Sequence, residues 1–282
     1  TSISSCTTIS ASGTYVLTTN IINSGATKCI EITSSNVIFD GAGYTIDGTD
    51  AINTIGVYVY NSSTALTNIT VKNLVLTDWY FGMWHKSAQN GSVINNTVSS
   101  SPHSGIFLQS SSNNNIIANN TASSNGNTGI YLETSESNTI TNNTAISNPR
   151  GIALESSSNN NTLIDNTANS NSVGILLGSS SSNTIANNTA ISNTNYGITL
   201  ESSSNNNLTS NTANSNNDNG IYLSDSSNYN NISNNIANSN WYGITLISSS
   251  NNNLTNNIAI LNSRGIVLQS SSNNNTLINN TA

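Results

Sequence analysis

A tetrapeptide of the form Gly-Ile-x-Leu, or a close variant of it, recurs through most of this chain at intervals of about 23 residues. It begins at Gly105, Gly129, Gly151, Gly174, Gly197, Gly220, Gly243 and Gly265. A period of this length is typical of stacked solenoid coils, in which each repeat buries its apolar side chains against its neighbours. We therefore predict one elongated domain over residues 1–282, with irregular coils and a capping role in 1–104 and regular repeats in 105–282.

The regular repeats hold asparagine at three fixed positions relative to a fixed alanine such as Ala122 or Ala145: seven before it, two before it and three after it. Five residues before the alanine stands an aliphatic residue. Identical residues in successive coils stack at the strand spacing of about 4.8 Å. We expect the aliphatic columns to fill a narrow interior and the asparagine columns to form amide ladders at the corners.

Alternation with a period of two dominates the chain, and no segment has a helical pattern. The sequence therefore predicts an all-β fold made of strands and turns, a parallel β-helix (β-solenoid) of about ten or eleven coils. In the irregular part, short β-branched runs such as Tyr15-Val16-Leu17, Ile21-Ile22 and Ile30-Glu31-Ile32 are predicted strands.

The composition is polar but almost uncharged, with 6% charged and 34% hydrophobic residues. Such a composition is otherwise typical of disorder, but a disordered segment has no reason to keep a repeat in phase. A net charge of -7 with only five Lys and Arg leaves no basic surface, so we expect no nucleic-acid partner. No apolar run approaches the roughly 20 residues of a membrane span, and the polar start at Thr1 is what a processed or trimmed chain would show.

Cys6 and Cys29 are the only cysteines and lack metal-ligand spacing. We expect a disulfide that ties the first strand to the next coil, and hence an extracellular location. Two free thiols in a cytosolic protein are the alternative.

The repeat Gly-Ile-x-Leu-x-x-Ser-x-x-Asn-x-Ile-x-x-Asn-x-Ala-x-x-Asn resembles the right-handed parallel β-helix repeats of the NosD-like and carbohydrate-binding/sugar-hydrolase (CASH) families. The segments Gly13-Thr14-Tyr15-Val16-Leu17 and Asp40-Gly41-Ala42-Gly43-Tyr44-Thr45-Ile46-Asp47-Gly48 are similar to those of cell-surface proteins of methanogenic archaea. The resemblance covers nearly the whole chain and implies a right-handed helix. It leaves the function open, because these families include surface-layer and polysaccharide-acting members.

Glu133 and Glu155 occupy the same outward position of successive coils, and Glu201 follows two coils further on. A separation of about 5 Å between the first two carboxylates would suit a retaining glycosidase pair or a calcium site. A solvated row of carboxylates is the simpler interpretation. We therefore assign no catalytic residue and no cofactor, with a structural calcium ion at this row as the one exception considered.

Soft metal ligands are scarce in this chain. His85 and His103 are the only histidines, Met83 is the only methionine, and the cysteines are expected to be paired. Copper, which the NosD resemblance suggests, is therefore not expected.

Sequons for N-glycosylation are frequent, and we expect the protein to be a glycoprotein that carries glycans at several of them. The candidates are Asn61, Asn68, Asn90, Asn95, Asn119, Asn142, Asn160, Asn187, Asn207, Asn231, Asn253, Asn274 and Asn279. Within the regular repeats each acceptor lies one residue away from a ladder position, so its side chain is predicted to point outward.

The third residue of the tetrapeptide also points outward and gives a partly apolar stripe, which suits lateral packing against another protomer or a sugar polymer. Its apolar members are Phe107, Tyr131, Leu176, Tyr222 and Val267. The last repeat stops at Ala282 partway through a coil without a helix, proline or charge to cap it, which favours further domains or self-assembly.

The leading functional prediction is a structural cell-surface protein that assembles with itself, end to end or laterally, into a filament, sheath or surface layer (S-layer). The alternative is a β-helix that binds or cleaves polysaccharide, including polysaccharide of the cell envelope, through the Glu133, Glu155 and Glu201 face. A third and weaker hypothesis is ice binding through an outward threonine column, which Ile236 and Ile258 interrupt. The column comprises Thr121, Thr144, Thr167, Thr189 and Thr212.

Overall fold

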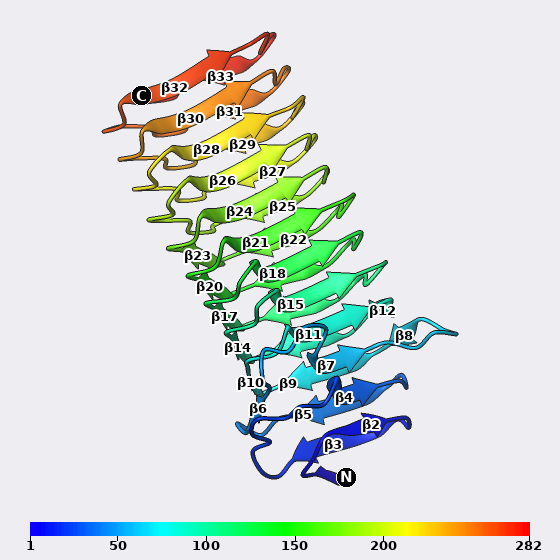
Figure 1. Ribbon diagram of the computed structural model, residues 1–282. Coiled ribbons are helices and arrows are strands. Elements are labelled where there is room, and N and C mark those ends of the chain that lie inside the picture. The colour runs from blue at the N-terminus through cyan, green and yellow to red at the C-terminus, as the bar shows by residue number, and fades with distance from the viewer.

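The computed structural model describes residues 1–282 and contains only strands and turns. The chain winds upward in stacked coils from the N-terminus, blue in Figure 1, to the C-terminus, red. All paired strands run parallel, and corresponding strands of successive coils lie side by side. The prediction of an all-β parallel solenoid is confirmed.

Three long sheets form the walls, and a pair of short strands forms a fourth. Sheet A has 13 strands: β1 (Ser2–Ile3), β3 (Gly13–Leu17), β5 (Val37–Asp40), β9 (Ile69–Lys72), β13 (Ser92–Ile94), β16 (Ile116–Ala118), β19 (Thr139–Thr141), β22 (Thr162–Ile164), β25 (Thr184–Ala186), β27 (Asn207–Thr209), β29 (Asn231–Ser233), β31 (Asn253–Thr255) and β33 (Thr276–Ile278).

Sheet B has 12 strands: β2 (Thr7–Ile9), β4 (Lys28–Ile32), β7 (Ile55–Val59), β11 (Phe81–Lys86), β15 (Ser104–Gln109), β18 (Thr128–Glu133), β21 (Arg150–Glu155), β24 (Val173–Gly178), β26 (Tyr196–Glu201), β28 (Asn219–Ser224), β30 (Tyr242–Ile247) and β32 (Arg264–Gln269). Sheet C has six: β6 (Thr45–Asp47), β10 (Val75–Thr77), β14 (Thr97–Ser99), β17 (Thr121–Ser123), β20 (Thr144–Ile146) and β23 (Thr167–Asn169). Strands β8 (Leu66–Thr67) and β12 (Ala88–Gln89) pair with each other.

Sheets A and B, with 13 and 12 strands, each contain slightly more strands than the ten or eleven coils expected. One predicted strand of the irregular N-terminal segment is wrong. Ile21 makes only a single bridge, to Ile46, and Ile22 is 57% exposed. The threonine column lies in register on the outer face of sheet C and is continued beyond Thr167 by single bridges, while ice binding stays an untested prediction.

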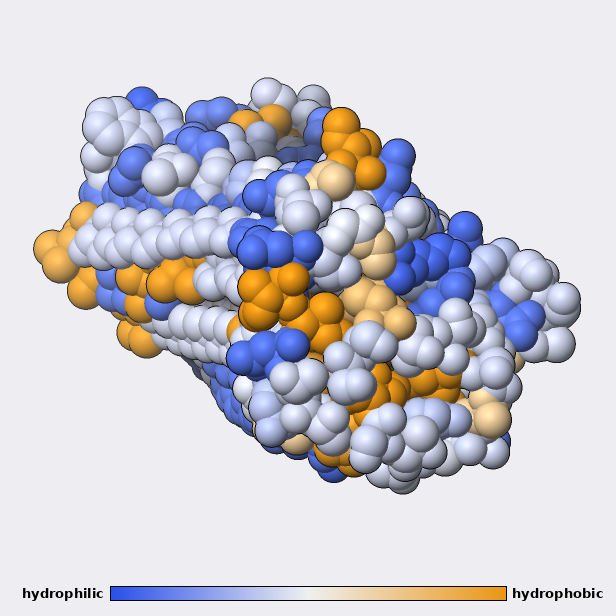
Figure 2. All heavy atoms as spheres, turned by 60° about the horizontal axis from the view of Figure 1, so that its bottom comes forward, coloured by the Kyte–Doolittle hydropathy of each residue, from blue (hydrophilic) through white to orange (hydrophobic).

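The interior is one apolar cluster of 49 buried residues that runs the length of the helix. It is built from residues that stack on their equivalents in the next coil, as Ile130 does on Ile152 and Leu132 on Leu154. The same stacking appears on the surface, where Figure 2 shows straight rows of side chains of like hydropathy along the helix. Column stacking therefore sets both the core and the outer surface.

The asparagine ladders form as predicted. Asn143 Nδ2 donates to Asn166 Oδ1 at 3.0 Å and to the carbonyl of Ile117 at 2.8 Å. Its Oδ1 accepts the backbone N–H of Asn120 at 2.9 Å. Each amide thus supplies partners to turn backbone that would otherwise be buried without any.

A fourth ladder, of serine, was missed by the sequence analysis. The backbone N–H of Ser158 donates to Ser180 Oγ at 3.1 Å, and that of Ser180 to Ser203 Oγ at 3.0 Å. The sequence feature that indicates this ladder is the serine that recurs in each repeat. Its hydroxyl oxygen accepts a hydrogen bond from the turn N–H of the preceding coil.

The repeat glycines are required by close approach and not by an unusual backbone angle. A Cβ on Gly151 would lie 2.5 Å from the carbonyl oxygen of Gly174 and 2.7 Å from Asn171 Nδ2. The only glycines with positive φ are Gly13 and Gly43, both in the irregular segment.

Near the N-terminus, Cys6 and Cys29 form the expected disulfide, with their Cα atoms 4.3 Å apart. No helix long and apolar enough to cross a membrane is present.

Candidate functional site on the outer face of sheet B

The outer face of sheet B carries three columns of side chains. The edge column comprises Ile55, Phe81, Ser104, Thr128, Arg150, Val173, Tyr196, Asn219, Tyr242 and Arg264. The central column comprises Tyr58, Trp84, Phe107, Tyr131, Ala153, Leu176, Thr199, Tyr222, Thr245 and Val267. The acidic column comprises Gln109, Glu133, Glu155, Gly178, Glu201 and Ser224.

Aromatic rings of the central column stack on one another over consecutive coils. The ring centroids of Phe107 and Tyr131 are 4.8 Å apart with planes only 4° from parallel, and those of Trp84 and Phe107 are 5.5 Å apart. Tyr58 continues the row, with its centroid 5.4 Å from that of Trp84. The stack leaves Phe107 only 4% exposed and Tyr131 8% exposed. The outward stripe predicted from the sequence exists, but its rings largely cover one another, and the half-buried Trp84 is the most accessible of these four.

Cations lie over these rings. Lys28 Nζ is 4.6 Å from the centroid of the Tyr58 ring, and Arg150 Cζ is 5.5 Å from that of Tyr131. Burial raises the pKa of Tyr58 to about 12 and raises the pKa of Tyr131 as well, with the neighbouring Glu155 adding to the second shift. Both phenols are therefore protonated at neutral pH, so they can donate hydrogen bonds or stack but cannot serve as bases.

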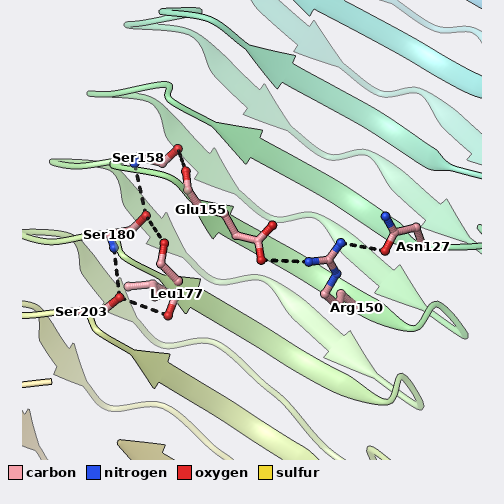
Figure 3. Close-up of polar contacts among 8 residues, drawn as sticks. Asn127, Arg150, Glu155, Ser158, Leu177, Ser180 and Ser203 are labelled. Carbon is pink, nitrogen blue, oxygen red and sulfur yellow. Dashed lines mark hydrogen bonds and ion pairs between the residues drawn. The ribbon is translucent and has the colours of Figure 1, made fainter. Parts of the chain in front are cut away.

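The structure brings Glu133 and Glu155 together, as predicted, as partners on adjacent strands. Each carboxylate already has a partner within the protein. Gln109 Nε2 donates to Glu133 Oε2 at 2.6 Å, and Arg150 Nη1 donates to Glu155 Oε1 at 2.9 Å. Figure 3 shows the Arg150 guanidinium between Glu155 and Asn127, whose Oδ1 it also contacts. The pair is thus held in an ion-pair and amide network, which weakens its case as a glycosidase pair.

Glu201 does not join this pair, because Gly178 stands between Glu155 and Glu201 in the acidic column. Together with Asp225 these residues line a shallow groove of about 350 Å³. Burial, with the negative charges of Asp225 and Glu155, raises the pKa of Glu201. No three His, Cys, Asp or Glu side chains come close enough together to hold a metal ion, and calcium at this row remains a prediction.

The sequons lie where their register placed them. Asn119, Asn142, Asn187 and Asn279 are exposed turn residues with φ between 52° and 56°. Others lie on sheet A, where Asn231 Nδ2 donates to Asn207 Oδ1 at 2.8 Å. The turn acceptors are therefore more open than the strand acceptors, whose amides bind each other.

Tyr58 and Trp84 belong to this face although the sequence did not predict it, and Tyr196 was expected on a loop edge beside the strand and not on the face itself. Tyr58 and Trp84 lie in the irregular coils, where the longer loops hide the register. Tyr196 stands before Gly197, where strict alternation breaks: a Cβ on Gly197 would lie 3.0 Å from the interior Ala213 Cβ, although the next residue, Ile198, is also buried. Simple alternation therefore gives the wrong direction for the Tyr196 side chain.

The family model described as a right-handed β-helix region matches residues 30–190, and the model described as periplasmic copper-binding protein (NosD) matches residues 150–232. No curated protein matches the sequence. The segment matched by NosD contains no histidine, cysteine or methionine, so its residues do not fit a copper site.

Solved structures share the fold at low identity. The A-module of the mannuronan C-5 epimerase AlgE6 of Azotobacter vinelandii is 16% identical, with a TM-score of 0.76, over 96% of this chain and 91% of that one. The periplasmic alginate epimerase AlgG is 15% identical, with a TM-score of 0.72, over 98% of this chain and 76% of that one. DFA-IIIase from Arthrobacter chlorophenolicus A6 without its lid is 15% identical, with a TM-score of 0.73, over 94% and 74%.

At these identities the likeness shows the fold alone. The right-handed β-helix match, by contrast, is a sequence match and spans more than half of the chain. The protein belongs to the family of right-handed parallel β-helix proteins.

Proposed function

We propose that the protein binds a polysaccharide along the outer face of sheet B, outside the cytoplasm. The observation that carries the proposal is the aromatic row of Tyr58, Trp84, Phe107 and Tyr131, which continues through consecutive coils parallel to the helix axis. A linear polymer with a repeating unit is the ligand that such a repeated surface matches. The accessible ring of Trp84 and the outer edges of its neighbours can pack against sugar rings, while sugar hydroxyls bind the polar groups beside them.

Buried polar atoms without partners mark the same face. Of the side-chain atoms that are buried without a hydrogen-bond partner, Trp84 Nε1, Thr128 Oγ1, Thr199 Oγ1, Asn219 Oδ1 and Thr245 Oγ1 all belong to its edge and central columns. Unpaired polar groups are rare in folded proteins, and a concentration of them favours a surface that a ligand or ordered water completes.

Several structurally similar proteins act on or bind carbohydrates, which supports a carbohydrate ligand for this protein. AlgE6 and AlgG are epimerases of alginate or mannuronan, and a DFA-IIIase structure contains the bound ligand GF2. AlgG and NosD are described as periplasmic, which agrees with a disulfide-bonded protein outside the cytoplasm. This chain differs in charge, because its net charge of -7 and its acidic column oppose a polyuronate. Binding is favoured over cleavage, because the two paired glutamates are already held and the nearest phenol, that of Tyr131, is a poor base.

The test is affinity electrophoresis and calorimetry against a panel of neutral and charged polysaccharides, with Trp84→Ala as the variant. We expect up to about a tenfold loss of affinity, since an aromatic contact contributes about 0.5–1.5 kcal/mol beyond the area that it buries. Tyr44→Ala is the matched control, because Tyr44 is an exposed aromatic residue outside sheet B. Equal affinity of Trp84→Ala and the unmodified protein would refute the site.

A second candidate is lateral self-assembly into a filament, sheath or surface layer. It is favoured by an apolar patch near the end of the chain, where Ile258, Ile260 and Leu261 are exposed, the last to 81%. Leu261 also has a φ of 59°, which asparagine adopts more readily than leucine. Leu261→Asn should therefore preserve folding while it reduces assembly, as seen by electron microscopy and light scattering. Monodisperse unmodified protein at high concentration would contradict this candidate.

N-glycosylation of the exposed turn sequons, including Asn119 and Asn142, is part of the same proposal. Glycans there would solubilise a surface with few charges without covering sheet B, since these turns connect sheets A and C. Intact-mass measurement of the natural protein tests it, and a mass equal to that of the bare chain would rule it out.

A further inference from the structure

A separate pocket lies on the outer face of sheet B toward its C-terminal end. It has a volume of about 220 Å³, and its lining includes Tyr196, Asp218, Asn219, Tyr222 and Thr245. The rings of Tyr196 and Tyr222 stack with centroids 5.1 Å apart and planes 15° from parallel. Tyrosines and small polar residues alternate here, so that Tyr222 lies between Thr199 and Thr245 in the central column.

Two hydrogen-bonding groups in the lining have no partner. Asn219 Oδ1 and Thr245 Oγ1 are buried without a hydrogen bond, and both residues are only 4% exposed. The amide oxygen of Asn219 is an acceptor, and the hydroxyl of Thr245 can both donate and accept. A ligand with N–H donors would satisfy the acceptors.

Carboxylates act on the rings of Tyr196 and Tyr222, while the cation beside the lining, Arg264, lies over a third ring, that of Tyr242, with its Cζ 5.7 Å from the centroid. Burial raises the pKa of Tyr222, a hydrogen bond with Ser224 lowers it in part, and the negative charges of Asp225, Glu201 and Asp218 raise it further. The three ion pairs of the protein join Lys28 to Glu31, Lys72 to Asp40 and Arg150 to Glu155, so none of these three carboxylates makes an ion pair. Burial also raises the pKa of Asp218, as expected for a carboxylate without a cationic partner.

We propose that this pocket binds an ammonium group, namely the free amino group of an amino sugar in a polysaccharide that lies along sheet B. The proposal rests on the proposed function and narrows its ligand to a cationic polymer. An ammonium group gains from the faces of Tyr196 and Tyr222, from charge-assisted hydrogen bonds to Asp218 and from the free acceptor of Asn219. A uronic acid would bring a second negative charge to the same place and be repelled.

The experiment compares three hexasaccharides with the same linkage by calorimetry: β-1,4-linked glucosamine, N-acetylglucosamine and glucose. The glucosamine hexamer is expected to bind about tenfold more tightly than the glucose hexamer, as one desolvated ammonium contact supplies. Asp218→Asn should reduce this preference to less than about threefold, while the affinity for the glucose hexamer stays unchanged.

Asp165→Asn is the matched control. It removes the same charge from a turn outside sheet B, at a position where equivalent turns carry asparagine, such as Asn142 and Asn187. Its preference for glucosamine should equal that of the unmodified protein. An equal loss of preference in both variants would overturn the pocket, because net charge alone would then explain the effect.

The outcomes separate the two proposals. If the glucose hexamer binds and Trp84→Ala weakens it, but glucosamine binds no more tightly, the pocket is refuted and the proposed function stands. If the glucosamine hexamer prefers the unmodified protein over Asp218→Asn but binds Trp84→Ala with unchanged affinity, the pocket stands and the extended site is refuted. Failure of all three hexamers to bind at millimolar concentration refutes both.

Discussion

Asn143→Ala tests whether the amide ladders, and not apolar packing alone, hold the coils together. Asn143 is buried in the middle of the ladder, where its Nδ2 serves Ile117 and Asn166 and its Oδ1 accepts from Asn120. Alanine removes all of these bonds. The backbone N–H of Asn120 is then left buried without a partner, since Asn143 Oδ1 is its only acceptor.

The expected cost is about 2–4 kcal/mol in the free energy of unfolding. One orphaned buried donor contributes about 1–3 kcal/mol, and each further hydrogen bond lost adds roughly 1 kcal/mol, offset in part because Asn166 Oδ1 keeps the backbone N–H of Asn143. Urea unfolding followed by circular dichroism gives the total. Amide hydrogen exchange gives the location, with protection at Asn120 expected to fall first because solenoid repeats couple mainly to their neighbours.

Asn217→Ala is the control for this substitution, because Asn217 is an exposed turn residue with ordinary backbone angles. It should change the free energy of unfolding by less than about 0.5 kcal/mol. Apolar packing alone would hold the coils together if Asn143→Ala destabilised the protein no more than Asn217→Ala, or if the amide of Asn120 kept its protection.

Three other predictions concern the core, the glycines and the disulfide. Burial lowers the pKa of His85 to about 4, below the value near 6.5 of an unfolded chain. As the pH falls from 6.5 to 4, the unfolded state therefore binds a proton at His85 while the folded state does not, which favours unfolding. Over this range the unmodified protein should lose on the order of 3 kcal/mol relative to His85→Leu, with no such difference above pH 7, and parallel stability curves for the two proteins would contradict it. Gly151→Ala should destabilise the protein by about 2–3 kcal/mol, because its Cβ would overlap the next coil. Gly178→Ala should be nearly neutral, because the nearest atom to its Cβ would be Glu155 Cγ at 3.4 Å. Equal thermal midpoints for the two variants would show that close approach does not require glycine at position 151. Reduction of the Cys6–Cys29 disulfide should lower the free energy of unfolding of the N-terminal coils by about 3 kcal/mol and expose them to proteolysis, while β21 stays protected. Loss of protection throughout the helix would show instead that the N-terminal coils support the whole solenoid.

Column identity made the fold predictable from the sequence. Each ladder asparagine and each interior aliphatic residue meets its own equivalent one coil away, so the pattern within one repeat already states the contact between repeats. The glutamate pair of Glu133 and Glu155 could be placed for the same reason. What could not be placed are contacts between different columns, such as the reach of Arg150 across Ala153 to Glu155.

The sequence by itself determined the parallel solenoid, the amide ladders and the disulfide, because these depend only on which residue recurs at which position. The tertiary structure decided the partners on the outer face: which glutamate is neutralised, how Tyr196 reaches Tyr222, and which polar atoms stay unpaired. The physical reason is local. Coils differ in length, with equivalent asparagines 22 to 24 residues apart. Strict alternation also breaks at the repeat glycines: a Cβ on Gly151 would lie 3.1 Å from the interior Ala168 Cβ, although Ile152 is buried too. These small changes leave the stacked interior in register but alter the direction of side chains outside it, such as Arg150 and Tyr196.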